Sequence, residues 1–147
     1  MKLVTQVRYG IRILLDLAMH QSYEIVRMRD IANRQNISIK YLEKLISIFR
    51  RAGFIESKRG RNGGHTLARN PETITLAQII QVFEKERIKK DVKHSPPGYP
   101  GYQDSLITRA WEEARQAFYD RLDRVTLANL SIDTTKMSWQ DSDLLIL

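Results

Sequence analysis

Apolar residues between positions 28 and 52 follow two helical patterns, and a few polar residues separate them. The first pattern, over residues 28–35, predicts a short helix with one apolar side. Asn36 and Ser38 then interrupt it, because Asn tolerates the backbone of a tight turn and Ser is a good N-cap. From residue 39 the apolar residues recur every three or four positions, which places them along one side of a second helix. These residues are Leu42, Leu45, Ile46, Phe49 and Ala52.

Gly53 directly follows the second helical pattern. A glycine in that place is typical of a helix C-terminus, because it adopts positive φ without strain. Two helices joined by a tight turn, the second of them amphipathic, indicate a helix-turn-helix unit whose second helix enters the major groove of DNA. The two helices carry the candidate DNA-binding residues Arg29, Ser38, Lys40, Tyr41, Glu43, Lys44 and Arg50.

Two short segments after this unit, residues 54–58 and 65–68, alternate like the strands of a hairpin. The tip between them is rich in glycine, which lets the backbone turn tightly and approach another surface. It also carries two arginines, which suit phosphates or a minor groove. A basic hairpin beside a helix-turn-helix predicts a winged helix. Its candidate DNA-binding residues are Arg59, Arg61, Asn62, Gly63 and His65, the last of which either packs or contacts a phosphate.

Two further helices complete a winged helix-turn-helix domain that we place at residues 1–84. A helix is predicted over residues 5–21, and Gly10 inside it marks either close packing or nothing. The other helix begins after Thr75, which caps it, and Gln78 three residues later completes a capping box. Its apolar pattern ends at the domain boundary, where charged residues of both signs follow.

Residues 85–103 are predicted to be a linker that also serves as a sensor loop. Their second half, residues 94–103, contains three of the chain's four prolines and two of its seven glycines. Such a composition excludes a helix or a central strand. We therefore expect an ordered but irregular loop at this boundary.

The longest predicted helix runs from Asp104 to about Val125 and, with a short turn or helix after it, forms a dimerisation helix over residues 104–130. Its apolar residues step by three and four, close to a coiled-coil seam. A stripe outside a compact core needs a cover, and a second copy is the simplest one, because most soluble oligomers are symmetric. Packing on its own domain is the alternative, and residues 131–147 are expected to form an extended tail. The predicted seam comprises Ile107, Trp111, Ala114, Phe118, Leu122 and Val125.

The predicted fold is thus mainly α with a small β-wing, and its charge is unevenly distributed. Residues 1–70 carry 14 Lys and Arg against 5 Asp and Glu, whereas residues 71–147 carry 10 against 12, for a net charge of +7. The basic excess belongs to the winged-helix half, as is typical of a nucleic-acid-binding surface. A solvated basic surface is the plainer interpretation of the same charge.

The composition excludes several other classes of function. The chain has no cysteine, which excludes disulfides, thiolate clusters and cysteine nucleophiles. It has no serine-elbow motif and no phosphate loop, so we do not expect an enzyme. Its three histidines have no acidic residue at metal-ligand spacing, and we expect neither a metal nor a cofactor, with His94 the only candidate in the sensor loop. No apolar run has bilayer length and no signal-peptide pattern is present, so a cytoplasmic protein without membrane contact is expected.

Six segments in register resemble the Rrf2-type transcription regulators, and the resemblance covers residues 1–130. The most specific is the wing, RGRNGGHTL, after RRAGFIES. The others are YGIRILLDLA, DIANRQNISIKYLEKLI, ITLAQIIQVFE, AWEEARQAF and TLANL. The resemblance implies a homodimer, crossed through the long helix, that binds a palindromic operator in double-stranded DNA, with a specificity-setting glutamate at Glu43.

Many members of that family hold an iron–sulfur cluster through three cysteines in the loop before the long helix. The resemblance places the corresponding positions at Lys93, Tyr99 and Ser105, and a fourth ligand position at Thr108. None of these side chains is a normal cluster ligand. The expected function is therefore a homodimeric, sequence-specific transcription regulator, a repressor, that works without a cluster.

What such a regulator would sense has two candidate answers. Tyr99, Tyr102 and Trp111, together with nearby prolines, are suited to line an apolar pocket for a small effector, although such residues also simply anchor loops. The acidic-then-apolar end of the tail, residues 141–147, is instead suited to dock a protein partner. Both alternatives require the effector to distinguish two states of the regulator.

Overall fold

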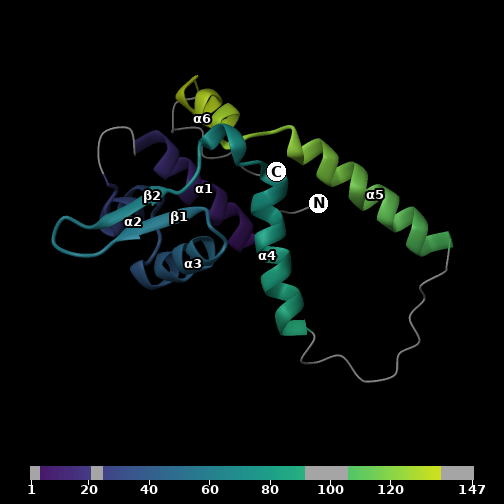
Figure 1. Cartoon of the computed structure of the whole chain (residues 1–147), viewed down its shortest axis with the longest axis horizontal. Coiled ribbons are helices and arrows are strands. Elements are labelled where there is room, and N and C mark those ends of the chain that lie inside the picture. Colours follow the sequence, from purple (N-terminus) through teal and green to yellow (C-terminus); the bar gives the residue numbers. More distant parts are fainter. Residues whose placement is uncertain (1–3, 21–24, 92–105, 137–147) are drawn as a thin grey trace.

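The computed structural model describes residues 4–20, 25–91 and 106–136, which form a compact body and one projecting helix (Figure 1). It confirms the predicted class, mainly helical with one small antiparallel sheet. Among the described helices, none is long and apolar enough to cross a bilayer. The elements in chain order are α1 (Thr5–His20), α2 (Met28–Gln35), α3 (Ile39–Arg51), β1 (Ile55–Lys58), β2 (Gly64–Leu67), the 3-10 turn η1 (Pro71–Thr73), α4 (Leu76–Asp91), α5 (Leu106–Asp123) and α6 (Leu127–Lys136).

Both predicted ends of α3 are confirmed. The Ser38 hydroxyl accepts a hydrogen bond from the backbone N–H of Tyr41 at 3.2 Å, which caps the first turn. At the other end Gly53 has a φ of 75°, and the N–H of Phe54 donates to the carbonyl of Phe49 at 2.9 Å. This is the Schellman arrangement, which turns the chain sharply from α3 into β1.

α1 lies at the centre of the body and contacts α2, α4, α6 and β2. Gly10 is where the packing is tightest, because a Cβ atom there would lie 2.7 Å from the ring of Phe83 and 2.9 Å from that of Phe49. The two rings meet edge to face with centroids 5.4 Å apart. Of the two interpretations of Gly10, close packing is therefore correct, and it joins α1, α3 and α4 in one core.

The wing consists of β1 and β2, paired antiparallel from Ile55 opposite Leu67 to Lys58 opposite Gly64. A third segment, which the sequence pattern did not reveal, lies beside β2. The Val26 N–H donates to the His65 carbonyl at 3.0 Å, and the His65 N–H donates back at 2.8 Å. The connection before α2 therefore anchors the wing to the helix-turn-helix.

The start of α4 is joined to the end of α5. Thr75 caps α4 by accepting from the N–H of Gln78 at 3.3 Å, as predicted, and it donates to Asp123 at 2.7 Å. The N–H of Leu76 also donates to the carbonyl of Val125 at 2.9 Å. The second half of the predicted capping box is missing, since the buried side-chain oxygen of Gln78 has no hydrogen-bond partner among the described residues.

Two predicted helix ends were wrong. α4 continues to Asp91 instead of ending at residue 84. Its last turns consist mostly of charged residues that are good helix formers, and they show no apolar periodicity. α6 continues to Lys136, so residues 131–136 are helical instead of extended. This helix begins at a Thr126–Asn129 capping pair and buries Leu127 completely, which the tail composition does not reveal.

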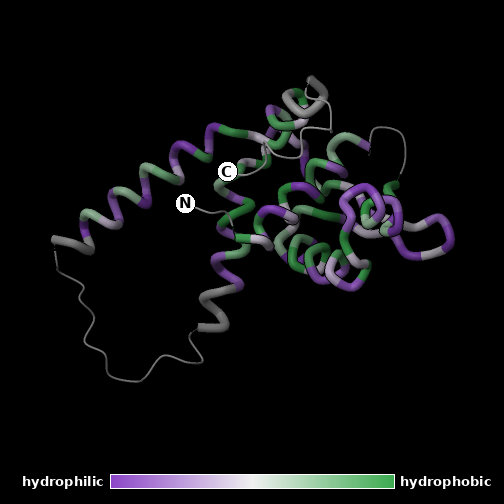
Figure 2. Tube along the Cα trace, turned by 180° about the vertical axis from the view of Figure 1, so that it is seen from behind, coloured by the Kyte–Doolittle hydropathy of each residue, from purple (hydrophilic) through white to green (hydrophobic). Residues whose placement is uncertain are grey.

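α5 departs from the body at this joint and points away from α4 (Figure 1). We call α5 the arm, and the body comprises α1–α4, the wing and α6. Every residue from 109 to 118 is exposed, and hydrophobic and hydrophilic residues alternate along the arm (Figure 2). Tyr119, by contrast, is buried, and α5 contacts α4. The distal half of the arm thus has no cover from the described parts of its own chain.

Candidate nucleic-acid interface

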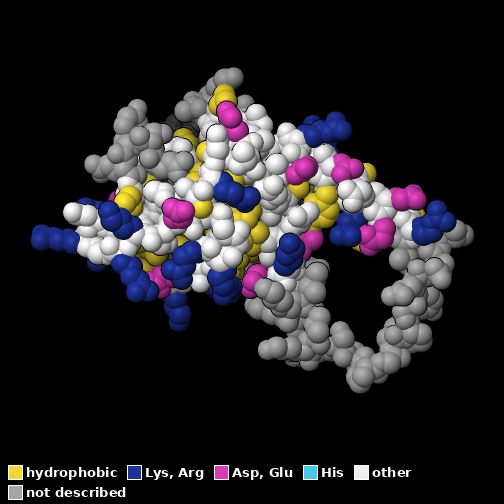
Figure 3. Space-filling model, viewed as in Figure 1, with side chains coloured by type: hydrophobic (Ala, Val, Ile, Leu, Met, Phe, Trp, Pro, Cys, Tyr) yellow, Lys and Arg dark blue, Asp and Glu magenta, His cyan; other side chains and the backbone are white. Residues whose placement is uncertain are grey.

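The predicted DNA-binding side chains of α2, α3 and the wing tip lie largely on the surface. α3 contacts β1, so the helix and the wing are neighbours. Lysines and arginines gather over the wing and along the edge beside α3, whereas most acidic side chains visible in this view lie over α4 and α5 (Figure 3). The exposed members are Arg29, Ser38, Lys40, Glu43, Lys44, Arg50, Arg59, Arg61 and Asn62.

The wing tip depends on two glycines. Gly60 has a φ of 113°, and its carbonyl accepts from the N–H of Gly63 at 2.9 Å. A Cβ atom on Gly63 would lie 2.2 Å from the carbonyl oxygen of Lys58. Neither position tolerates a side chain, and the tight turn leaves Arg59 and Arg61 exposed at the tip.

Two predicted contact residues, Tyr41 and His65, are half-buried. The ring of Tyr41 packs edge-on against Tyr9 with centroids 5.8 Å apart, and burial followed by the nearby Tyr9 raises the pKa of its hydroxyl. His65 Nδ1 lies 2.8 Å from the hydroxyl oxygen of Ser57. Burial, with a smaller effect of Arg50, lowers the pKa of His65 and so favours the neutral form of its ring. Packing of His65 is thus observed, and its contact with DNA stays a prediction.

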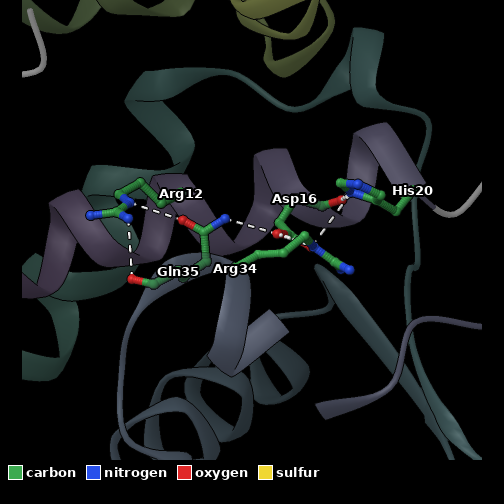
Figure 4. A network of polar contacts seen from close by, with 5 residues as sticks. All are labelled: Arg12, Asp16, His20, Arg34 and Gln35. Carbon is green, nitrogen blue, oxygen red and sulfur yellow. Dashed lines mark hydrogen bonds and ion pairs between the residues drawn. The ribbon is translucent and has the colours of Figure 1, made fainter. Parts of the chain in front are cut away.

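A polar network centred on the buried residues Asp16 and Gln35 links α1 to α2, and the sequence pattern did not predict it (Figure 4). Asp16 is only 1% exposed, and its carboxylate accepts from the guanidinium of Arg34 at 2.6 and 2.9 Å and from the amide of Gln35 at 2.8 Å. The signal in the sequence is Asp16 itself, a lone carboxylate within the apolar run Ile13–Leu17.

The predicted dimerisation seam is partly visible on the arm. Trp111 is 70% exposed and Phe118 37%, while Ala114 is exposed and Leu122 half-buried. Val125 lies past the end of α5, in the joint with α4. The side chains of Ile107 and Thr108 lie outside the described residues.

The predicted sensor elements fall mostly outside the described residues as well. They comprise Lys93, His94, Tyr99, Tyr102, Ser105 and the tail end 141–147. Of the candidate effector pocket, Trp111 is described, and it is exposed on the arm. In the three described stretches of the chain, no group of three His, Cys, Asp or Glu side chains is placed to hold a metal ion.

An amphipathic helix with an exposed polar side, set beside a basic two-stranded wing, defines a winged-helix DNA-binding protein. Residues 3–133 match the family described as "Rrf2: Iron-dependent Transcriptional regulator", and the chain belongs to this family. It is a DNA-binding transcription regulator and not an enzyme. The resemblance inferred from the sequence is confirmed.

Individual relatives agree with this assignment. The chain is 42% identical over 135 residues to protein rrf2 of Nitratidesulfovibrio vulgaris, covering 92% of this chain and 90% of that protein. The solved structure of T. potens IscR has a TM-score of 0.74 at 33% identity, covering 94% of this chain and 93% of that one. CymR, the global cysteine regulator of B. subtilis, has a TM-score of 0.71 at 33% identity, covering 91% and 98%.

The family's iron dependence does not extend to an iron–sulfur cluster in this chain. Such clusters are held by cysteine thiolates, and the sequence contains no cysteine. Among the described histidines, His20 Nδ1 lies 2.8 Å from the Asp16 carbonyl and His65 Nδ1 lies beside Ser57. The available donors therefore do not fit the cluster.

Proposed function

We propose that this chain acts in the cytoplasm as a homodimeric repressor that binds a two-fold symmetric operator without an iron–sulfur cluster. The observation that carries the proposal is the joint exposure of the α3 polar side and the basic wing tip on one domain. The helix is shaped for base edges in a major groove, and the wing arginines suit adjacent phosphates. A regulator that occupies its operator in this way represses by excluding other proteins from the same DNA.

The exposed arm supports the dimer. Its apolar side chains at Trp111, Ala114 and Phe118 step by three and four and are uncovered within the described part of one chain. Charged side chains on the polar side of α5 pair with one another, as Arg115 and Glu112 do in an ion pair at 2.7 Å. Two copies that bury their apolar stripes together would present two α3 helices about one DNA turn, roughly 34 Å, apart.

Control of the repressor is proposed to act through the segment between α4 and α5, residues 92–105. A small apolar or aromatic effector is the first candidate, since the adjoining arm exposes Trp111. A protein that docks on the C-terminal tail is the second. Either ligand would have to favour one spacing of the two α3 helices over another.

Selection of duplexes from a randomised library by the purified protein tests the proposal. We expect an enriched inverted repeat, two protomers per duplex by light scattering, and binding that an iron chelator does not change. The protein should also be colourless after anaerobic preparation. No enriched sequence would overturn the proposed operator, and one protomer bound per duplex would overturn the proposed dimer.

A further inference from the structure

We propose that Asp16 and Arg12 are positioning residues for sequence recognition: through Gln35, Tyr9 and Tyr41 they hold the first turn of α3 in the orientation that base readout needs. This inference deepens the proposed function and rests on it. Neither Asp16 nor Arg12 belongs to the candidate interface itself. Their effect on DNA binding would pass through the helix-turn-helix that they brace.

The first step is the buried charge on α1. A carboxylate that is 1% exposed is costly to bury unless it is paired and hydrogen-bonded. Asp16 meets that demand with α2: Arg34 donates to its two carboxylate oxygens at 2.6 and 2.9 Å, and Gln35 donates at 2.8 Å. These directional bonds fix how α2 lies across α1 (Figure 4).

The second step carries the constraint to the turn. Gln35 is the last residue of α2 and is 3% exposed. Arg12 donates to its side-chain oxygen at 2.9 Å and to its backbone carbonyl at 3.1 Å. The next residue, Asn36, adopts the left-handed conformation with a φ of 50° and starts the turn into α3. Arg12 therefore holds the backbone at the point where the chain changes direction between the two helices.

The third step reaches the DNA-facing helix. The Arg12 guanidinium lies over the ring of Tyr9 at 5.3 Å from its centroid, within the range of a cation–π contact. Tyr9 in turn packs edge-on against Tyr41, in the first turn of α3. Lys40 and Lys44 are exposed on either side of Tyr41 along the sequence. An unbroken chain of contacts thus runs from Asp16 to the surface that would meet the bases.

Base readout and phosphate binding depend on this bracing to different degrees. Phosphate contacts tolerate small changes in orientation, whereas hydrogen bonds to base edges require accurate placement. Asp16 is buried, but its partner Arg34 is 36% exposed, so the guanidinium stays solvated when the carboxylate charge is removed. Weakening the network should therefore lower the ratio of specific to non-specific affinity more than it lowers non-specific affinity.

The test uses Asp16→Asn in the full chain, with two duplexes as probes. One is the duplex that the wild-type protein selects from a randomised library, and the other is a scrambled duplex of the same length and composition. We expect the ratio of the two affinities to fall by about tenfold, the discrimination that one pair of hydrogen bonds to a base supplies, with little change on the scrambled duplex. Glu72→Gln, which removes an exposed carboxylate from η1, is the control and should leave the ratio unchanged.

Arg12→Met provides a second variant in case Asp16→Asn does not fold. It removes the link between Gln35 and Tyr9 without creating a buried charge, and its matched control is Arg8→Met, one turn earlier on α1 and outside the network. The ratio should fall for Arg12→Met and stay constant for Arg8→Met. A ratio that is unchanged in the folded variants, or equal losses on both duplexes, would overturn the positioning role. Failure of the wild-type protein to select any duplex would instead overturn the proposed function.

Discussion

The body and the arm place their apolar side chains in opposite environments. In the body, large side chains such as Leu14 and Phe49 have 0% exposure. In the arm, Trp111 and Phe118 are 70% and 37% exposed. Contiguous exposed apolar surface on a folded protein usually marks an interaction site. The body thus has its own core and carries the candidate DNA-binding residues, while the described part of the chain supplies no cover for the apolar side chains of the arm.

The largest expected effect comes from Trp111→Glu, which changes the arm and leaves the body intact. A carboxylate placed in a seam between two copies would be buried without a partner, so the dimer should dissociate at micromolar concentration while the body stays folded. Losing the tethered second half-site should lower affinity for the selected duplex by about a hundredfold or more. Light scattering and duplex titration measure the two effects.

Arg109→Glu is the matched control for this substitution. It introduces the same side chain at an exposed position on another side of α5. This variant should remain dimeric and keep its affinity. If Trp111→Glu also remained dimeric, the seam would lie on a different surface of the molecule.

The second prediction concerns the wing tip, which we propose contacts phosphates. Replacing both Arg59 and Arg61 by Ala should weaken binding to every duplex, because both side chains are exposed at the wing tip. The slope of log affinity against log salt should become shallower by about one unit for each phosphate that the variant no longer neutralises. Lys85→Ala, an exposed cation on α4, should leave the slope unchanged. An unaltered slope in the double variant would show that the wing arginines do not contact phosphates.

The third prediction separates specificity from affinity within the body. Glu43 is an exposed carboxylate among cations on α3, where it would be repelled by phosphates. Glu43 would contribute to sequence specificity if its carboxylate accepted a hydrogen bond from a cytosine amino group. Glu43→Ala should lower the ratio of affinities for the selected and the mismatched duplexes about tenfold. The overall affinity for DNA should stay similar or rise. Selection from the randomised library measures this directly, with Glu56→Ala on the wing as the control, and a uniform loss on all duplexes would exclude the assignment.

The contrast between body and arm also shows which features the sequence predicts. Local signals were sufficient for the ends of α3, because the Ser38 cap and the positive φ of Gly53 depend on neighbouring residues alone. Asp16 stands out in the sequence as a lone carboxylate in an apolar run, but its role was missed because its partners lie on another helix.

The ends of α4 and α6 were missed for a different physical reason. Apolar periodicity is the signal from which the helices were predicted, and the last turns of α4, up to Asp91, lack it because most of their residues are charged. Pairings of single residues, such as Val26 with His65, leave no pattern at all, since one bridge has no period. The exposed polar positions of α3 were accessible to sequence analysis because they follow from the same periodicity as the core, whereas the wing tip was found from its glycines.

The smallest predicted effect lies in the wing and depends on pH. Burial, followed by the charge of Arg50, lowers the pKa of His65 below its ordinary value of 6.5. The unfolded chain keeps the ordinary value, so below that pH the unfolded state binds more protons at this site than the folded state. By linkage, His65 contributes stability that is fully present above pH 6.5 and is lost as the pH falls through its folded pKa.

His65→Gln should therefore reduce the loss of stability on acidification. Glutamine can still accept a hydrogen bond from the Ser57 hydroxyl, but it does not titrate. Thermal unfolding at about pH 7.5 and about pH 5.5 should give a larger drop in Tm for the wild type than for the variant. Arg50→Gln should shift the wild-type drop in the same direction by a smaller amount, because burial is the larger cause of the lowered pKa. Equal drops in Tm for the wild type and His65→Gln would mean that other groups cause the loss of stability in acid. The folded wing would then not favour the neutral form of His65.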